Sequence, residues 1–518
     1  MSEHGNANAL DWLLEPSIQG IGPLQAWKDT PFVLLLGRPG AGKSRELVLA
    51  DKHGWLGDSL RVEVADIASA PGVALDDLLV GKNTASGTFR LILDGLDEAL
   101  LLNPRFVQQL RRWFGTRLGP DGKPALRLAL SCRWADWPAP AVSELASLWQ
   151  LNEFPRLILC PLRRSDVVAT LQCRFGSEAD KFSQQMQDQQ LAGIACWPQA
   201  MRELLDEFSQ TRQLATSHGK IISDQVNRHC RLADSPDDTL RWEKSSTDPE
   251  WRQRVAGRLA ACMIWSGKPA LHIGAAMAAD SSLTTTDLAH TDELWHGQRK
   301  PVQLADLDAI IHHTRLMKRL GEGPAWRFAS QVHQEWLAAD WIAFQQLDEK
   351  RLRLLFGTTQ EGGWAVFPPL ASVAAWLAQM QSEFRQMLLR DDPLVLLRLD
   401  AATLSEKDRH DIVEALLQRT QQAEVLDPGV RQAHFPSLKH AQLESQLCGW
   451  LEAPDMHDVT KTLALEIAKK CHLTGLAAFL WKLYPHASKR LKIDLAGGLL
   501  RLAREGFDDQ WRKVLSRD

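Results

Sequence analysis

Residues 31–44 read "PFVLLLGRPGAGKS" and decide how the first third of the chain folds. An apolar run of strand length leads into the pattern G-x-x-x-x-G-K-S at residues 37–44. Glycine tolerates positive φ and close backbone approach, so Gly37, Gly40 and Gly42 let successive N–H groups point at phosphate oxygens. A helix that begins directly after such a loop adds the positive end of its dipole. The stretch therefore predicts a phosphate-binding loop between a buried strand and a helix.

The last two residues of this loop carry its chemistry. We expect Lys43 to reach the β- and γ-phosphates of a nucleotide and Ser44 to bind Mg²⁺ through its hydroxyl. A chance glycine-rich turn is the alternative, but the position between a strand and a helix favours the nucleotide. The sequence thus predicts a P-loop NTPase that binds a nucleoside triphosphate with Mg²⁺.

A second apolar run, "FRLILDGLDEAL" at residues 89–100, ends in three carboxylates. An unpaired buried carboxylate is costly, so such acids usually face water, a partner charge or a metal. Asp94 ends the strand, and we expect it to hold the Mg²⁺ shell together with Ser44. Asp97 and Glu98 follow, and one of them, preferably Glu98, would orient or deprotonate the attacking water. The alternative is a solvated helix N-terminus, where the dipole favours acids.

Short apolar runs alternate with helical patterns up to residue 162. Strands are predicted at residues 31–37, 60–68, 89–94, 126–132 and 156–162, and helices at residues 43–53, 74–80, 104–117 and 139–148. This order predicts an α/β domain, a parallel sheet covered by helices on both faces. After residue 162 the strand signal nearly vanishes, and we expect helices through residue 345. Short amphipathic helices then continue to the end and predict an all-α repeat region, an α-solenoid.

The composition sets limits on function and compartment. The 518 residues are enough for three or four domains, and the net charge of −4 gives no chain-wide basic field for nucleic acid or an anionic membrane. The eight cysteines form no CxxC pair and have no metal-ligand spacing with histidine, which is typical of reduced thiols in the cytosol. The N-terminus lacks the features of a signal peptide, and no apolar run could span a bilayer. We therefore expect a cytoplasmic protein with no membrane contact.

With the P-loop and the acidic strand end established, the stretch "LILDGLDEA" resembles the NACHT-type branch of the STAND proteins, signal transduction ATPases with numerous domains. Further stretches resemble that family in the expected order across residues 31–345. "LRLALSCR" resembles its sensor strand, which implies that Arg133 lies near the γ-phosphate. "IACWPQAMRELL" resembles the lid motif, which implies that Pro198 lies against the nucleotide. "WRFASQVHQEWLAADWIA" resembles the end of the winged-helix domain, although the family's phosphate-sensing histidine falls on Ser330 here, with His333 one turn later.

The resemblance implies a domain order and a mode of action. The domains would be an N-terminal lead-in (1–30), a P-loop NTPase domain (31–162), a helical lid (163–215), a winged-helix-like helical domain (216–345) and HEAT-like helical repeats (346–518). Such proteins are switches: ADP holds the domains closed, and exchange for ATP with Mg²⁺ frees them to rotate and self-associate, with slow ATP hydrolysis. The C-terminal helices would bind the trigger, a protein or a nucleic acid. In bacteria the family implies defence against phage. No effector domain is recognisable, so the effector would be a separate protein or lie on a longer chain.

Two other functions fit the same motifs. One is an AAA+-like motor or remodelling ATPase acting on nucleic acid or protein, in which Arg111 or Arg112 would reach across a ring interface. The other is a scaffold that holds nucleotide for stability without turning it over.

Overall fold

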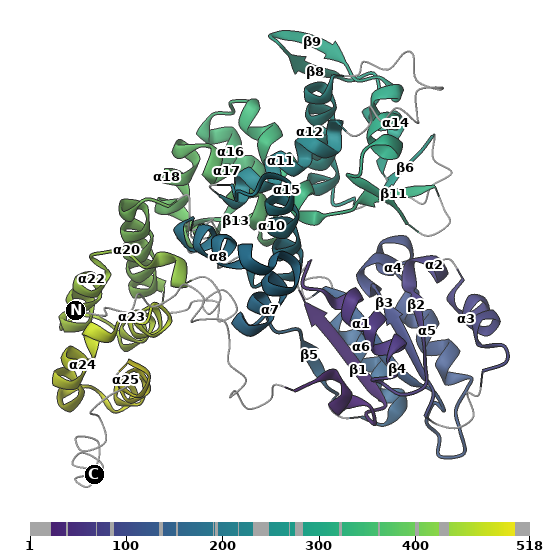
Figure 1. Ribbon diagram of the computed structural model, residues 1–518, viewed down its shortest axis with the longest axis horizontal. Coiled ribbons are helices and arrows are strands. Elements are labelled where there is room, and N and C mark those ends of the chain that lie inside the picture. Colours follow the sequence, from purple (N-terminus) through teal and green to yellow (C-terminus); the bar gives the residue numbers. More distant parts are fainter. Residues whose placement is uncertain are drawn as a thin grey trace. The chain divides into compact units, whose positions relative to one another are not determined.

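The computed structural model describes most of the chain and divides it into two compact units. Unit 1 comprises Met1–Gln187, Ile194–Leu214 and Lys220–Ala338, and unit 2 comprises Asp188–Gly193, Ala215–Gly219 and Ala339–Asp518. Both are drawn in Figure 1. The described residues are 22–37, 40–68, 70–82, 88–133, 138–151, 154–189, 191, 195–215, 217–231, 248–268, 270–274, 283–320, 324–360, 363–398, 404–423 and 435–502.

The core of unit 1 is a five-stranded parallel sheet in the order β2-β3-β4-β1-β5. The strands are β1 (Phe32–Gly37), β2 (Ser59–Glu63), β3 (Arg90–Asp94), β4 (Arg127–Arg133) and β5 (Arg156–Ile158). β4 lies between β1 and β3, so the loop after β1 and the acids after β3 are separated by one strand at the same edge. The parallel sheet predicted from the alternating pattern is confirmed.

Helices cover both faces of this sheet (Figure 1). They are α1 (Lys43–Lys52), α2 (Val64–Ile67), α3 (Pro71–Leu79), α4 (Leu96–Leu102), α5 (Phe106–Gly115) and α6 (Ala139–Ala146). On one face Leu35, Ile92 and Ala129 pack against Leu47 and Ala50 of α1. On the other face the alternate residues of β1, β3 and β4 pack against α2 to α6. Successive residues of each strand thus serve different cores, as the two-residue period of a strand requires.

Two of the predicted strands are shorter than expected. The strand predicted at residues 60–68 ends at Glu63 and continues as α2. The strand predicted at residues 156–162 ends at Ile158, and Pro161, which has no N–H to donate, could not have continued it. The next amide, that of Leu162, donates instead to the carbonyl of Cys196 at 2.7 Å. This bond joins the exit of the sheet to the segment before α10.

The remainder of unit 1 mixes helices with short strands, which the expectation of helices from residue 163 through residue 345 did not include. The helices up to Phe344 are α7 (Arg164–Phe175), α8 (Ala179–Asp188), α10 (Pro198–Thr211), α11 (His218–Arg231), α12 (Pro249–Trp265), α13 (Thr285–Leu288), α14 (Leu304–His313) and α15 (Gln331–Phe344). Of these, α8, α11 and α15 each have residues in both units. The strands are β6 (Leu271–His272), β7 (Leu283–Thr284), β8 (Asp292–Trp295), β9 (Gln298–Pro301), β10 (Met317–Arg319) and β11 (Ala325–Phe328). They form a four-stranded sheet β10-β11-β6-β7 and the hairpin β8-β9. Strands of two to four residues are too short to show a two-residue period in the sequence.

Unit 2 is mainly helical, but it also contains a hairpin that the predicted all-α region lacks. Its helices are α16 (Glu349–Phe356), α17 (Ala371–Met380), α18 (Ser382–Asp391), α19 (Pro393–Leu396), α20 (Glu406–Ala423), α22 (Leu443–Glu452), α23 (Asp458–Lys470), α24 (Ala477–Leu483) and α25 (Lys489–Leu502). The hairpin pairs β12 (Gly357–Gln360) with β13 (Gly363–Val366). A Cβ at Gly357 would lie 2.1 Å from the carbonyl oxygen of Ala365, so only glycine fits there.

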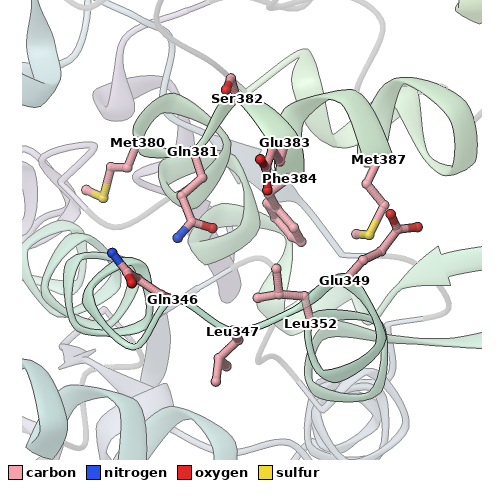
Figure 2. A pocket seen from close by; sticks show the side chains of 10 residues that line it. All are labelled: Gln346, Leu347, Glu349, Leu352, Met380, Gln381, Ser382, Glu383, Phe384 and Met387. Carbon is pink, nitrogen blue, oxygen red and sulfur yellow. The ribbon is translucent and has the colours of Figure 1, made fainter.

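A pocket of about 450 Å³ opens in unit 2 beside α16 and α18 (Figure 2). Leu352 and Phe384 face each other across it, and Glu349 lies at one side near Met387 (Figure 2). Glu349 accepts hydrogen bonds from Arg353 and Arg390, so its charge is balanced within the unit. Within the described ranges, no helix is both long enough and apolar enough to cross a bilayer.

The fold generates a test at Arg90, the first residue of β3. Its side chain is fully buried and donates to the carbonyls of Trp27, Lys28, Thr30, Leu56 and Leu128. Burial lowers the pKa of Arg90 to about 10, so it stays charged at neutral pH. We predict that Arg90→Met lowers the opening free energy of β3 by about 3 kcal/mol, because several carbonyls lose their donor. Hydrogen exchange of peptides covering residues 89–94 measures this, and unchanged protection would contradict the assignment.

Candidate functional site

The loop from Gly37 to Ser44 lies where β1 ends and α1 begins. Gly40 and Gly42 have φ of 74° and 93°, the left-handed region that favours glycine. Residues 38 and 39 lie outside the described ranges. The amine of Lys43 donates to the carbonyl of Gly37 at 2.8 Å, back across the loop, and burial lowers its pKa. The described part of the loop thus has two glycines in the left-handed region and the cation that a phosphate-binding loop uses.

Asp94 links this loop to the acidic end of β3. It is 5% exposed, and its Oδ1 accepts from the hydroxyls of Ser44 at 3.2 Å and Ser131 at 2.6 Å. Its Oδ2 accepts from the guanidinium of Arg61, on β2, at 2.7 Å. Although burial opposes the charge on Arg61, the hydrogen bond and charge of Asp94 raise its pKa. The predicted Mg²⁺ residues Ser44 and Asp94 are therefore direct neighbours.

This donor set fits magnesium. Mg²⁺ prefers oxygen ligands and is usually bound by one or two carboxylates or hydroxyls together with phosphate oxygens and water. Ser44 and Asp94 offer one hydroxyl and one carboxylate. Among the described residues there is no cluster of three or more His, Cys, Asp and Glu side chains that would hold a metal by protein ligands alone. The arrangement therefore suits an ion that arrives with a nucleotide.

Asp97 is held by Arg133, the last residue of β4. The Nε of Arg133 lies 2.8 Å from Oδ2 of Asp97, and the Arg133 amide donates to Oδ1 at 3.3 Å. Arg133 also donates from Nη1 to Oε1 of Gln331, the first residue of α15, at 2.7 Å. One guanidinium thus joins an acid of the sheet edge to a helix about 200 residues further along the chain.

Glu98 is held by two cations from the small sheet of unit 1. Lys318 on β10 donates to Oε1 at 3.2 Å, and Arg327 on β11 forms an ion pair with the same oxygen. Lys318 and Arg327 are direct cross-strand partners in the antiparallel pair, so both side chains emerge on one face. Burial lowers the pKa of Lys318 and lowers that of Arg327 to about 10. Glu98, the preferred water-activating acid, is therefore neutralised in this conformation.

The first residues of α10 meet the glycine loop through Gln199. Pro198 begins α10, and a Cβ at Gly42 would lie 3.5 Å from its Cγ. The amide of Gln199 donates to the carbonyl of Gly40 at 3.2 Å, and its side chain donates to the hydroxyl of Ser330 at 3.0 Å. Ser330, where the resemblance expects a phosphate-sensing histidine, thus bonds the same residue of α10 that contacts the loop.

His333 occupies a different environment. Its Nε2 lies 2.9 Å from Oε1 of Gln225 on α11, and its ring centroid is 5.6 Å from that of His229. The side chain is buried among these helices. Of the two residues near the family's histidine position, Ser330 is the one bonded to the lid.

The structure gathers the predicted residues Lys43, Ser44, Asp94, Asp97 and Arg133 at one edge of the parallel sheet. Sequence reasoning did not find the partners of these residues or those of Glu98 and Ser330, which are Arg61, Ser131, Gln199, Lys318, Arg327 and Gln331. One of these had a signal in the sequence: Ser131 is a hydroxyl in an otherwise apolar strand, and a buried polar side chain requires a partner.

Comparisons with known proteins add little to this geometry. No protein-family model matches the chain, and no curated protein matches it either. Among solved structures, the chain is similar to the crystal structure of a STAND protein with a tetratricopeptide repeat sensor from Pyrococcus horikoshii. That similarity has a TM-score of 0.27 and 10% sequence identity, and covers 95% of this chain and 82% of the other. A TM-score this low supports no conclusion about fold or function.

The first prediction from the site concerns Arg61. Replacing Arg61 by glutamine removes the guanidinium from Oδ2 of Asp94, where it would compete with the metal for one carboxylate. We therefore expect Arg61→Gln to reach half-maximal binding of a fluorescent nucleotide analogue at an Mg²⁺ concentration about three- to tenfold lower than wild type. Arg127→Gln is the matched control, because Arg127 is equally shielded but pairs with Asp29. A higher Mg²⁺ requirement in Arg61→Gln would show that Arg61 assists metal binding.

The second prediction concerns Glu203, which accepts a hydrogen bond from Gln199 at 3.0 Å. Burial raises the pKa of Glu203 to about 7, above its ordinary value of 4.5. The folded state therefore keeps its proton longer than the unfolded state, and stability falls as pH rises from about 5 through 7. At pH 8 Glu203→Gln should raise the opening free energy of α10 by the order of 3 kcal/mol, with little change at pH 5.

Hydrogen exchange of α10 peptides, corrected for intrinsic rates, measures this pH dependence. Exposed Glu250 provides the control, because Glu250→Gln should leave the α10 profile unchanged. A wild-type opening free energy that is flat between pH 5 and pH 8 would contradict the raised pKa.

Proposed function

We propose that this chain is a nucleotide-dependent switch of the STAND class, NACHT type. One observation carries the proposal: both acids beyond Asp94 are linked to residues outside the parallel sheet, Glu98 directly and Asp97 through Arg133 of β4. Asp97 reaches Gln331 through Arg133, and Glu98 is paired with Lys318 and Arg327. A site designed only for steady hydrolysis has no need to neutralise its own acids from a distant sheet. A switch does need such contacts, because they couple the nucleotide site to the arrangement of other elements.

The cations of the site would respond to nucleotide by changing partners. A bound triphosphate with Mg²⁺ would supply negative charge that competes with the carboxylates for these cations. Lys43 would exchange the carbonyl of Gly37 for phosphate oxygens, and Arg133 would exchange Asp97 for the terminal phosphate. Because Arg133 also bonds Gln331, its movement would act directly on α15. Release of Glu98 by Lys318 and Arg327 would then leave this carboxylate able to orient water.

The finer parts of the proposal rest on the resemblance of the sequence motifs. The switch would use ATP and ADP, hydrolyse ATP slowly, and self-associate when activated. Its helical unit 2 would bind the trigger, a protein or a nucleic acid, and a separate effector protein would receive the signal. The setting would be the cytoplasm of a bacterium, in defence against phage.

The experiment combines three measurements on the full chain: the nucleotide retained after purification, single-turnover ATP hydrolysis, and molecular mass before and after addition of ATP with Mg²⁺. A switch predicts retained ADP, slow turnover and growth in mass with ATP. A stable hexamer whose turnover is stimulated by substrate would instead identify an AAA+-like motor. Retained nucleotide with no hydrolysis and no change in mass would identify a scaffold.

The sharpest prediction concerns the ion pairs of Glu98. Arg327→Gln removes one of these ion pairs. We expect the closed conformation to lose about 1.4 kcal/mol of stability, which should raise the rates of single-turnover hydrolysis and of ADP release about tenfold. Lys318→Gln should act in the same direction with smaller size, because Lys318 is the more exposed partner. Arg319→Gln is the matched control, since Arg319 follows on the same strand and its side chain emerges on the opposite face.

Glu98→Gln separates the two roles of this acid. It removes both ion pairs and also the carboxylate that would orient water, so we expect the larger, ATP-bound species to form while hydrolysis is lost. Wild-type hydrolysis in Glu98→Gln would show that another residue, such as Asp97, activates the water. Unchanged rates in Arg327→Gln would show that these ion pairs do not restrain the site.

A further inference from the structure

The last described helices of unit 2 carry an excess of positive charge. Residues 467–493 contain no Asp or Glu, but they contain six Lys or Arg residues, namely Lys469, Lys470, Lys482, Lys489, Arg490 and Lys492. The whole chain has a net charge of −4. A stretch of this sign within an acidic protein is a local basic field, which the overall composition conceals.

Part of this stretch forms a continuous basic–aromatic surface, defined here as Trp481, Lys482, Tyr484, Lys489, Arg490 and Lys492. It runs from α24 through the turn Tyr484–His486 into the first turn of α25, the last helices in Figure 1. The rings of Trp481 and Tyr484 are stacked, with centroids 6.2 Å apart and planes 16° apart. The amine of Lys492 lies 5.7 Å from the centroid of Tyr484. Aromatic faces and cations are thus interleaved.

These cations are not used in ion pairs within the helices that carry them. Lys482, Lys489 and Arg490 are exposed, and in the part of the chain that the structure describes none of them forms an ion pair. Three cations at the start of α25 also oppose the helix dipole, which favours acids there. The nearby carboxylates, Asp458 and Asp494, accept hydrogen bonds from Ser488 and Thr462. The positive charge is therefore available to a ligand.

We propose that the basic–aromatic surface binds single-stranded nucleic acid. Surfaces of this class pair phosphates with Lys and Arg and stack bases on aromatic rings, which suits Lys482, Lys489 and Arg490 beside Trp481 and Tyr484. A double helix keeps its bases stacked internally and offers none to the rings. An acidic peptide or an anionic membrane would also bind the charges but would offer no bases to stack on the rings. RNA and DNA share the chemistry, and a preference between them would come from the 2′-hydroxyl.

Binding at this surface does not require the nucleotide site, so it stands independently of the proposed switch. If both hold, the surface identifies the class of trigger as nucleic acid. Measuring binding without ATP or Mg²⁺ keeps the two proposals separable, because a failed switch would not abolish it.

The test measures fluorescence anisotropy of labelled single-stranded RNA and DNA of about 20 nucleotides with the full chain, at about 50 and 200 mM salt. The triple variant carries Lys482→Glu, Lys489→Glu and Arg490→Glu, and it should bind at least about tenfold more weakly. The slope of log affinity against log salt concentration should fall in magnitude by about 2, since each phosphate contact contributes about 0.7. Lys350→Glu, Lys407→Glu and Lys439→Glu form the matched control, with the same charge change at exposed lysines elsewhere in unit 2. The control should bind like wild type.

A second variant tests the rings separately from the charges. Trp481→Leu with Tyr484→Leu keeps every cation, so affinity should fall about tenfold while the salt slope stays unchanged, as expected for lost base stacking. Thermal unfolding of both variants establishes that unit 2 is folded. Equal loss in the control variant, tighter binding of duplex than of single strands, or equal competition by polyglutamate or anionic vesicles would each overturn the proposal.

Discussion

The site depends on a buried carboxylate that must be given hydrogen-bond donors. Asp94 is almost fully shielded from water, and its ionised form is tolerable only because donors from three elements converge on it. Ser44 comes from α1, Ser131 from β4 and Arg61 from β2. The same bonds fix the start of α1 against the ends of β2, β3 and β4. The requirement to satisfy one carboxylate therefore sets the geometry of the loop, the acids and the sensor strand together.

Around Asp94 the cations outnumber the acids. The site contains five cations, Lys43, Arg61, Arg133, Lys318 and Arg327, and four acids, Asp94, Asp97, Glu98 and the exposed Glu63. Burial lowers the pKa of Lys43, Lys318 and Arg327, so their charged forms are held at a cost that a further anion would relieve. An excess of partly desolvated cations beside a glycine loop is complementary to a polyphosphate. In the proposed switch the acids would be temporary partners of these cations, so that the site would hold balanced charge with and without nucleotide.

The sequence predicted the parts of the site that are local and missed the parts that depend on distant pairing. The glycine loop, Ser44 and Asp94 follow from short motifs because strand, turn and helix chemistry act over a few residues. Lys318 and Arg327 lie 220 or more residues from Glu98, on strands of three and four residues with no readable period. Gln199 could not be foreseen as the link between Gly40 and Ser330, because its role comes from the docking of α10. The hairpin β12-β13 was missed for the same reason as β10 and β11.

The size of the Glu98 interaction decides what kind of control it can exert. Side-chain exposure is 20% for Glu98, 11% for Arg327 and 43% for Lys318, so neither pair is fully desolvated. Pairs of this exposure contribute on the order of 1 kcal/mol each, whereas moving a conformational equilibrium from 1:99 to 99:1 takes about 5.5 kcal/mol. Two ion pairs alone would therefore leave a substantial population in the other conformation. The bonds of Gln331 to Arg133 and of Gln199 to Gly40 and Ser330 must therefore contribute to the free-energy difference between the two conformations as well. In the proposed switch all of these bonds would end on residues of the nucleotide site or of α10, so one ligand would weaken them together, which a single strong ion pair would not permit.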